Sequence, residues 1–252
     1  MFDEQYIDVD FDGDVPPGMS TGCKPETNEQ LAERCAAPRF GDRNDLIPES
    51  EWKELCELHN GRLRECVRTV LDQNGEGSCV GNATVGCAMF RGYYLYGAAP
   101  WVPLSAMSIY KRIGTSSQSG AYISDGATYS AKDGLLPLEG SDYEHTHPAI
   151  GFRKSLPSGW KQTAKMWRPT WERCDTLAET MTALLTFKPC LIGRDGHSVY
   201  YFLPAYNGSR LMVGYCNSWA GGRNGWGERI NDRQPTGLGW DSRSKASRLT
   251  VY

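Results

Sequence analysis

In several segments of the chain before Pro189, apolar residues recur with a helical period. Between Cys79 and Tyr96 they return every three or four positions, which predicts one long helix. Shorter helices follow from the same period and from residues that favour helix starts, such as the capping box of Thr176 with Glu179. These shorter helices are expected over residues 28–37, capped by Asn28, over 48–59, 103–114 and 124–134, the last capped by Ser124 or Asp125, and from 176 to shortly before Pro189.

Beyond Pro189 the apolar pattern changes to alternation, with many β-branched and aromatic residues, which is typical of strands. Strands are expected over residues 190–193, 197–204 and 210–219. The last two are separated by a short polar stretch in which Asn207 and Gly208 suit a tight hairpin turn. Helices followed by antiparallel strands indicate an α+β protein with two lobes or layers.

The predicted elements divide the chain at about residue 48. Residues 1–47 look like an acidic N-terminal arm, because the first 14 positions hold six carboxylates and no basic residue. Residues 48–252 form the main domain, with a helical half at about 48–150, a β half at about 151–230 and an irregular tail over 231–252.

One stretch of the arm imitates the start of a calcium-binding loop. Asp8, Asp10, Asp12 and Gly13 are in register, but the position that requires Glu is Met19. Prolines also obstruct the helix that should follow such a loop. We therefore interpret the stretch as a solvated acidic tail and expect no metal there.

Composition narrows the class of protein. The net charge of −3 argues against a general nucleic-acid binder, and no apolar run approaches the length of a membrane helix. The acidic N-terminus is unlike a secretory signal, so we expect a soluble protein that is cytoplasmic or associated with an assembly. Nine cysteines without a CxxC pair suit a reducing compartment and give little support to a zinc site. His145 and His147 are interpreted as residues of a surface loop.

Cys79 follows a Gly-rich turn and begins the longest predicted helix. A thiol at a helix start meets the positive end of the helix dipole and unpaired N–H groups, which favour a nucleophilic thiolate. Gln73, six residues upstream, can place its side-chain amide beside the Cys79 N–H and form a two-donor oxyanion hole. A buried structural thiol would be the simpler interpretation if Cys79 stood alone.

A base for this thiol is available in the β half. His197 begins one predicted strand, and Asn217 lies at the end of its hairpin partner, so the two side chains can meet. An Asn that binds one ring nitrogen fixes the imidazole and leaves the other nitrogen for the thiol. Trp219 follows closely and can cover that hydrogen bond from water.

The segments "DQNGEGSCVGNA" and "GHSVYYF…VGYCNSWAGGRNGWGE" together resemble the papain family of cysteine proteases, and most closely its short bacterial and viral members. The likeness runs from about residue 48 to 230. It implies a papain-like fold with an N-terminal helical lobe and a C-terminal antiparallel β lobe. It also implies hydrolysis of peptide bonds, with Cys79 as nucleophile, His197 as base and then acid, and Asn217, Gln73 and Trp219 in the roles described above. It implies a peptide or protein substrate and no cofactor.

The sequence departs from the family pattern at several positions. Val80 follows the cysteine where the plant and lysosomal enzymes usually have an aromatic residue, and Glu76 stands where they keep a disulfide cysteine. The arm is also much shorter than a typical inhibitory pro-segment. Two other functions therefore stay open. One is an idle papain-like domain that docks through its arm or tail in a larger, for example viral, assembly. The other is an acyl transferase or cell-wall peptidase of related fold.

Overall fold

The fold is described from a computed structural model, which describes residues 22–73, 75–98, 101–138, 152, 155–194, 196–218, 238–241 and 247–251. It combines a six-stranded sheet with helices that pack around one long central helix, so the predicted α+β class is confirmed. The helices are α1 (Asn28–Arg34), α2 (Glu49–Glu65), α3 (Cys79–Tyr96), α4 (Ala106–Ile113), α5 (Ile123–Asp133), α7 (Trp160–Ala164) and α8 (Leu177–Leu185), with a 3-10 turn η1 (Phe40–Asp42). The strands are β1 (Trp171–Arg173), β2 (Cys190–Arg194), β3 (His197–Asn207), β4 (Arg210–Cys216), β5 (Leu238–Asp241) and β6 (Ser247–Val251).

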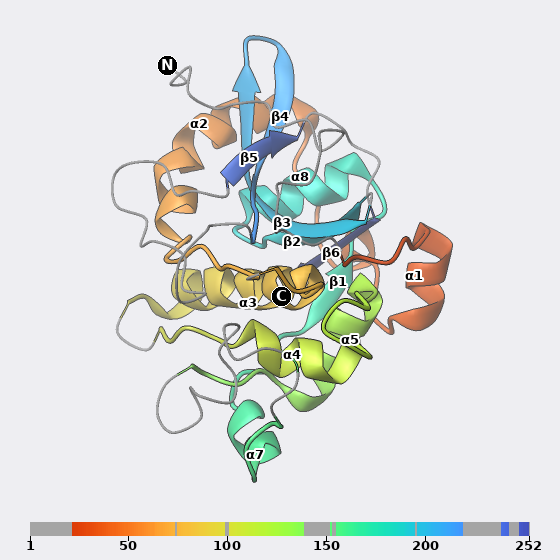
Figure 1. The fold of residues 1–252 in the computed structure, drawn as a ribbon. Coiled ribbons are helices and arrows are strands. Elements are labelled where there is room, and N and C mark those ends of the chain that lie inside the picture. Colours follow the sequence, from red (N-terminus) through yellow and green to blue (C-terminus); the bar gives the residue numbers. More distant parts are fainter. Residues whose placement is uncertain are drawn as a thin grey trace.

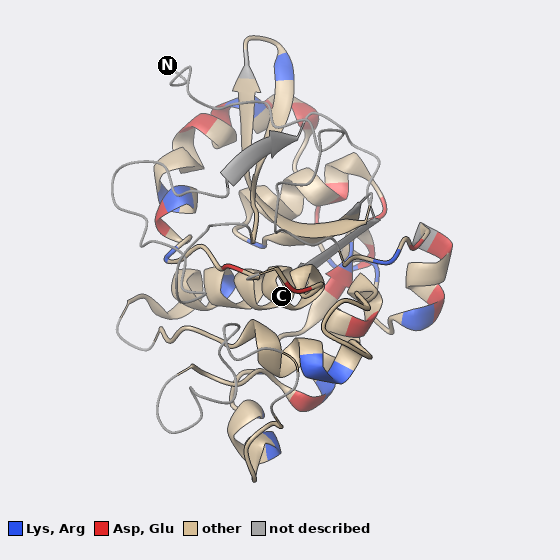
Figure 2. Cartoon of the chain, viewed as in Figure 1, with Lys and Arg blue, Asp and Glu red and all other residues tan. Residues whose placement is uncertain are grey.

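Helix α3 runs across the middle of the molecule, with the sheet on one side and α4 and α5 on the other (Figure 1). It carries a single charged residue, Arg91, whereas charged side chains are frequent on the outer helices α1, α2 and α5 (Figure 2). Most of its residues are buried, as expected for an apolar helix between two layers. The prediction of one helix over Cys79–Tyr96 is confirmed.

Small residues let α3 approach its neighbours closely. A β-carbon on Gly81 would meet the carbonyl of Ala106 at 2.7 Å, and one on Gly86 would overlap the ring of Tyr200. Ala106 belongs to α4 and Tyr200 to β3, so the backbone of α3 packs directly against elements on both of its sides. These close contacts hold α3, and with it Cys79 at its start, in place between the two layers.

The sheet is antiparallel throughout, in the order β1-β6-β2-β3-β4-β5. Strands β3 and β4 form the predicted hairpin, with Asn207 opposite Arg210, so the two residues between them are Gly208 and Ser209. Gly208 has a φ of 63°, a value that suits glycine at such a turn. The hairpin brings the beginning of β3 close to the end of β4.

Two parts of the sequence-based division differ from the structure. Strands β5 and β6 lie within the predicted tail 231–252, and β6 pairs with both β1 and β2 inside the sheet. Helix α2, assigned to the helical half, packs on the sheet, where Trp52 and Cys56 contact Met181 and Leu185 of α8. Apolar contacts between residues so far apart in the sequence leave no local sequence pattern that could predict them.

The described part of the predicted arm is also packed into the fold. Leu31 and Phe40 are fully buried, and Arg39 forms a backbone bridge with Arg173. Two predicted helix caps are wrong: Thr27, not Asn28, caps α1 in a capping box with Gln30, and α5 begins after Tyr122 without a side-chain cap. The Thr176–Glu179 capping box of α8 is present as predicted.

Candidate active site

The Cys79 thiol lies at the first residue of α3 and is completely buried. Ser78 immediately precedes the helix. Asn82 Nδ2 donates to the Ser78 carbonyl at 3.0 Å and to the Ser78 Oγ at 3.1 Å. These bonds connect the first turn of α3 to the residue before it. The thiol therefore has a fixed position at the helix start, where unpaired N–H groups gather.

Burial raises the pKa of the Cys79 thiol to about 12, although the N–H groups of Ser198, Gly22 and Val80 act against this rise. Ser198 is the residue after His197, so the thiol lies beside the start of β3. Gly22 belongs to the segment before α1 and reaches the same sulfur. The site in this form therefore holds a protonated, covered thiol.

His197 and Asn217 meet as predicted for the two ends of the hairpin. His197 Nε2 lies 2.7 Å from Asn217 Oδ1, and both residues are buried. Asn217 Oδ1 also accepts a bond from the Ser218 N–H at 2.7 Å, which identifies it as the oxygen of the amide. Nε2 must therefore carry the proton of the neutral imidazole, and Nδ1, which is buried, is the basic nitrogen.

Gln73 is hydrogen-bonded to Ser218, the residue that follows Asn217. Its backbone N–H donates to the carbonyl of Ser218 at 2.8 Å, and its side-chain Oε1 accepts from the Ser218 hydroxyl at 2.7 Å. Its Nε2 donates to the carbonyl of Glu76 at 2.6 Å. Since Ser218 binds the oxygen of the amide, the nitrogen of Gln73 has to face the turn that leads to Cys79.

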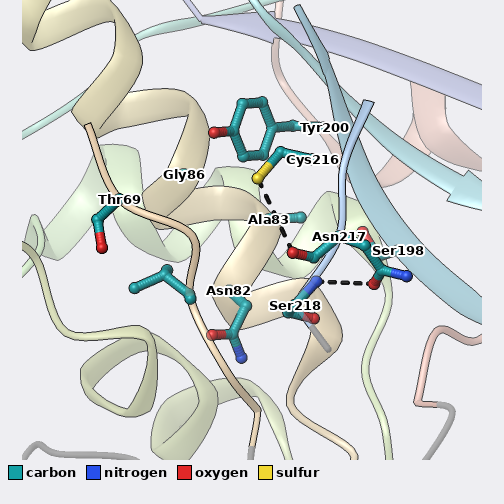
Figure 3. A pocket seen from close by; sticks show the side chains of 10 residues that line it. Thr69, Asn82, Ala83, Gly86, Ser198, Tyr200, Cys216, Asn217 and Ser218 are labelled. Carbon is teal, nitrogen blue, oxygen red and sulfur yellow. Dashed lines mark hydrogen bonds between the residues drawn. The ribbon is translucent and has the colours of Figure 1, made fainter. Parts of the chain in front are cut away.

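A small pocket lies behind these residues, between α3, the β3–β4 hairpin and residues 69–71 (Figure 3). Asn82, Ser198, Asn217 and Ser218 contribute polar groups to it, and Tyr200 and Cys216 close its apolar end. Figure 3 shows the bond from the Ser218 N–H to Asn217 at the edge of this pocket. The residues that line this pocket surround Asn217 and so support the His197–Asn217 pair.

Glu76, the residue in place of the family's disulfide cysteine, binds a backbone group instead. Its Oε1 accepts from the N–H of Phe152 at 3.1 Å, and Lys111 Nζ donates to the carbonyl of the same residue at 2.9 Å. Burial raises the pKa of Glu76, opposed by the Phe152 N–H and Lys111. All nine cysteines lie in the described part of the chain, where they are buried and none forms a disulfide.

Trp219, the remaining predicted site residue, lies outside the described residues. His145 and His147, interpreted as loop residues, and the acidic stretch from Asp8 to Gly13, interpreted as a solvated tail, also lie outside them. Within the described part of the chain, no three His, Cys, Asp or Glu side chains gather closely enough to hold a metal ion. The same part has no helix of the length and apolar character needed to cross a membrane.

Two contributors to the site were not predicted. Ser218 stands in the quoted motif but received no role, because a hydroxyl that binds an amide across the fold has no signal in sequence spacing. Gly22 has no side chain at all, and its backbone N–H donates to the carbonyl of Gly196 at 2.8 Å while opposing the rise that burial causes in the pKa of the nearby Cys79 thiol. Neither could be found from residue type alone.

Searches among protein-family models and among curated proteins give no match for this chain. Solved structures do match it over more than nine tenths of its length. Xylellain, a cysteine protease from Xylella fastidiosa, superposes with a TM-score of 0.53 and 17% identity, covering 92% of this chain and 91% of its own. The chain has the papain-like fold.

Two further papain-like structures give the same result. Digestive procathepsin L2 from the larval midgut of Tenebrio molitor matches with a TM-score of 0.58 and 15% identity, over 93% of this chain and 77% of its own. A stem bromelain precursor matches with a TM-score of 0.58 and 12% identity, over 94% and 84%. At such low identities the likeness extends to the papain-like fold alone.

Proposed function

We propose that the chain is a papain-like cysteine peptidase that hydrolyses peptide bonds in peptide or protein substrates. The observation that carries the proposal is the bond of 2.7 Å from His197 Nε2 to Asn217 Oδ1, at the strand start that adjoins the Cys79 thiol. Since this bond leaves Nδ1 as the basic nitrogen, the imidazole has the tautomer that a thiol nucleophile requires. No cofactor is needed for this chemistry.

In the proposed reaction, Nδ1 of His197 takes the Cys79 proton and the thiolate attacks the peptide carbonyl carbon. The carbonyl oxygen becomes an oxyanion, held by the Cys79 N–H and by an N–H of Gln73. The imidazolium then gives its proton to the leaving amine as the carbon–nitrogen bond breaks. Water, activated by His197, attacks the thioester, which releases the acid and restores the thiol. Asn217 holds the ring throughout.

The test compares Cys79→Ala with Cys87→Ala in hydrolysis of a mixed peptide library. Cys87 is a matched control, because it is a second fully buried thiol of α3. Loss of hydrolysis in Cys79→Ala alone supports the peptidase. Unchanged hydrolysis in Cys79→Ala refutes it, and cleavage of peptidoglycan without cleavage of peptides would instead favour the cell-wall peptidase.

A further inference from the structure

Helix α3 is preceded by a serine that does not cap it. A serine at this position normally has an extended backbone, and its hydroxyl accepts a bond from an N–H group of the first helical turn. Ser78 instead has a ψ of 16°, and its hydroxyl accepts no bond from the first turn of α3, which the structure describes in full. Three other helices of the chain do have a capping hydroxyl on extended backbone: Thr27 before α1 with a ψ of 165°, Ser105 before α4 with 112° and Thr176 before α8 with 162°.

The side chain of Asn82 binds the Ser78 hydroxyl in place of this turn. Asn82 Nδ2 donates to the Ser78 Oγ at 3.1 Å and to the Ser78 carbonyl at 3.0 Å. The Asn82 backbone N–H donates to the same carbonyl at 3.0 Å. Both residues are buried, so water does not compete for the hydroxyl. These bonds hold Ser78 in a conformation that leaves α3 uncapped.

The other end of the Asn82 amide adds nothing to the packing of α3. Its Oδ1 is buried and accepts no hydrogen bond from the described part of the chain. Asn82 lines the small pocket beside Asn217 and Ser218 without bonding to either of them (Figure 3). Asparagine is also less favourable than alanine inside a helix. A buried residue that lowers helix stability and bonds only to Ser78 is typical of a residue retained for a functional site.

The N–H groups that stay uncapped are those around the thiol. Cys79 is the first residue of α3 and is completely buried. Burial raises the pKa of its thiol, and the N–H groups of Val80 and of Cys79 itself are among the groups that oppose this rise. A capping hydroxyl accepts from the second or third N–H of a helix, which here belong to Val80 and Gly81. If Ser78 capped α3, its hydroxyl would therefore compete with the sulfur for the same donors.

We propose that Asn82 is a positioning residue of the Cys79 nucleophile, which binds the Ser78 hydroxyl and so leaves the N–H groups at the start of α3 to the sulfur. Asn82 acts through Ser78 and does not touch the reacting atoms. The inference rests on the proposed peptidase function only for its effect on hydrolysis. Its effect on the ionisation of the thiol does not require that function.

The test compares the wild type, Asn82→Ala and the double variant Ser78→Ala with Asn82→Ala. It measures kcat/KM for a fluorogenic peptide and the pH dependence of alkylation of Cys79 by iodoacetamide, located by peptide mass mapping. In Asn82→Ala the released hydroxyl caps α3, and the thiolate loses a donor. A lost hydrogen bond to a charged group should lower kcat/KM by about tenfold and move the alkylation profile by about one pH unit to higher pH.

The double variant separates this role from a merely structural one. Ser78→Ala removes the hydroxyl that would cap α3, so in the Asn82→Ala background it should restore most of kcat/KM and return the alkylation profile toward that of the wild type. A second loss that adds to the first would overturn the proposal, as would wild-type values in Asn82→Ala.

Thr84→Ala is the matched control. Thr84 is another fully buried polar residue of α3, and its hydroxyl donates one turn back to the Val80 carbonyl at 2.7 Å. Its removal leaves Ser78 uncapping and should keep both the alkylation profile and kcat/KM at wild-type values. A shift in Thr84→Ala as large as that in Asn82→Ala would overturn the proposal.

If urea unfolding shows that Asn82→Ala does not fold, Asn82→Leu replaces it, because leucine fills the site and has no donor. Failure of both variants to fold would overturn the proposal, since Asn82 would then be required for the fold itself. Alkylation does not depend on turnover, so a shifted profile in a chain that cleaves no peptide would refute the peptidase and leave the role of Asn82 intact. Wild-type hydrolysis that persists unchanged in Asn82→Ala would overturn that role and leave the peptidase intact.

Discussion

The Ser218 hydroxyl determines which way the Gln73 amide faces, so its removal should weaken the proposed oxyanion hole. In Ser218→Ala the two backbone bonds of Ser218 persist, and only the bond of 2.7 Å to Gln73 Oε1 is lost. Both residues are buried, Gln73 completely, so water cannot simply replace the donor. A buried bond between uncharged groups contributes about 1 to 2 kcal/mol, which corresponds to a fall of about 5- to 30-fold in kcat/KM.

The assay is kcat/KM for a fluorogenic peptide in four proteins: wild type, Ser218→Ala, Gln73→Ala and the double variant. Gln73→Ala removes an oxyanion donor and should lower kcat/KM by about 10²- to 10³-fold. Because Ser218 acts through Gln73, the double variant should equal Gln73→Ala. Ser130→Ala, which removes another buried hydroxyl on α5, controls for general destabilisation. An equal effect of Ser218→Ala with and without Gln73 would refute the reasoning.

Three further predictions concern the His197 imidazole, the buried cysteine thiols and the Glu179 carboxylate. Asn217→Ala frees the ring of His197 to rotate and should lower kcat more than KM, by about 10-fold or more in steady-state assays; an unchanged kcat would contradict this. Burial raises the pKa to about 12 for Cys56, Cys79 and Cys216 and to about 11 for Cys66, from an ordinary 9.0. These thiols remain protonated in the folded state while the unfolded chain ionises. The free energy of unfolding in urea should therefore fall above pH 9, by about 1.4 kcal/mol per pH unit for each thiol, and a flat profile would be inconsistent. Burial raises the pKa of Glu179, but the N–H groups of Asp175 and Thr176 together with Arg39 outweigh it and hold this pKa below its usual value. Glu179→Gln should therefore lower the free energy of unfolding by about 2 kcal/mol. An equal urea midpoint in the variant and the wild type would count against this role of Glu179.

The elements that carry a strong local pattern were predictable from the sequence. Helix α3 matches its predicted bounds because a Gly-rich turn precedes a long apolar period. The β3–β4 hairpin follows from alternation and the Asn207–Gly208 pair, although the turn itself falls one residue later. The same hairpin brings His197 and Asn217 together, so this contact was available to spacing arguments.

Long-range backbone pairing was not predictable. Strand β6 is short and charged at Arg248, yet it lies inside the sheet between β1 and β2, because its partners are more than 50 residues away and supply the hydrogen bonds. Residues 22–24 are a stronger case. Their contacts with Gly196 and Ala121 use only backbone groups, and a glycine in an acidic arm has no side chain that could reveal them.

The central claim, that Cys79 is a working nucleophile activated by His197, is tested most directly by covalent labelling with an epoxide thiol inhibitor. Intact-mass and peptide analysis should find one adduct per chain, on Cys79, in the wild type, and none in His197→Ala over the same time. An adduct on Cys79 that forms equally fast without His197, or no adduct in the wild type, would contradict the account.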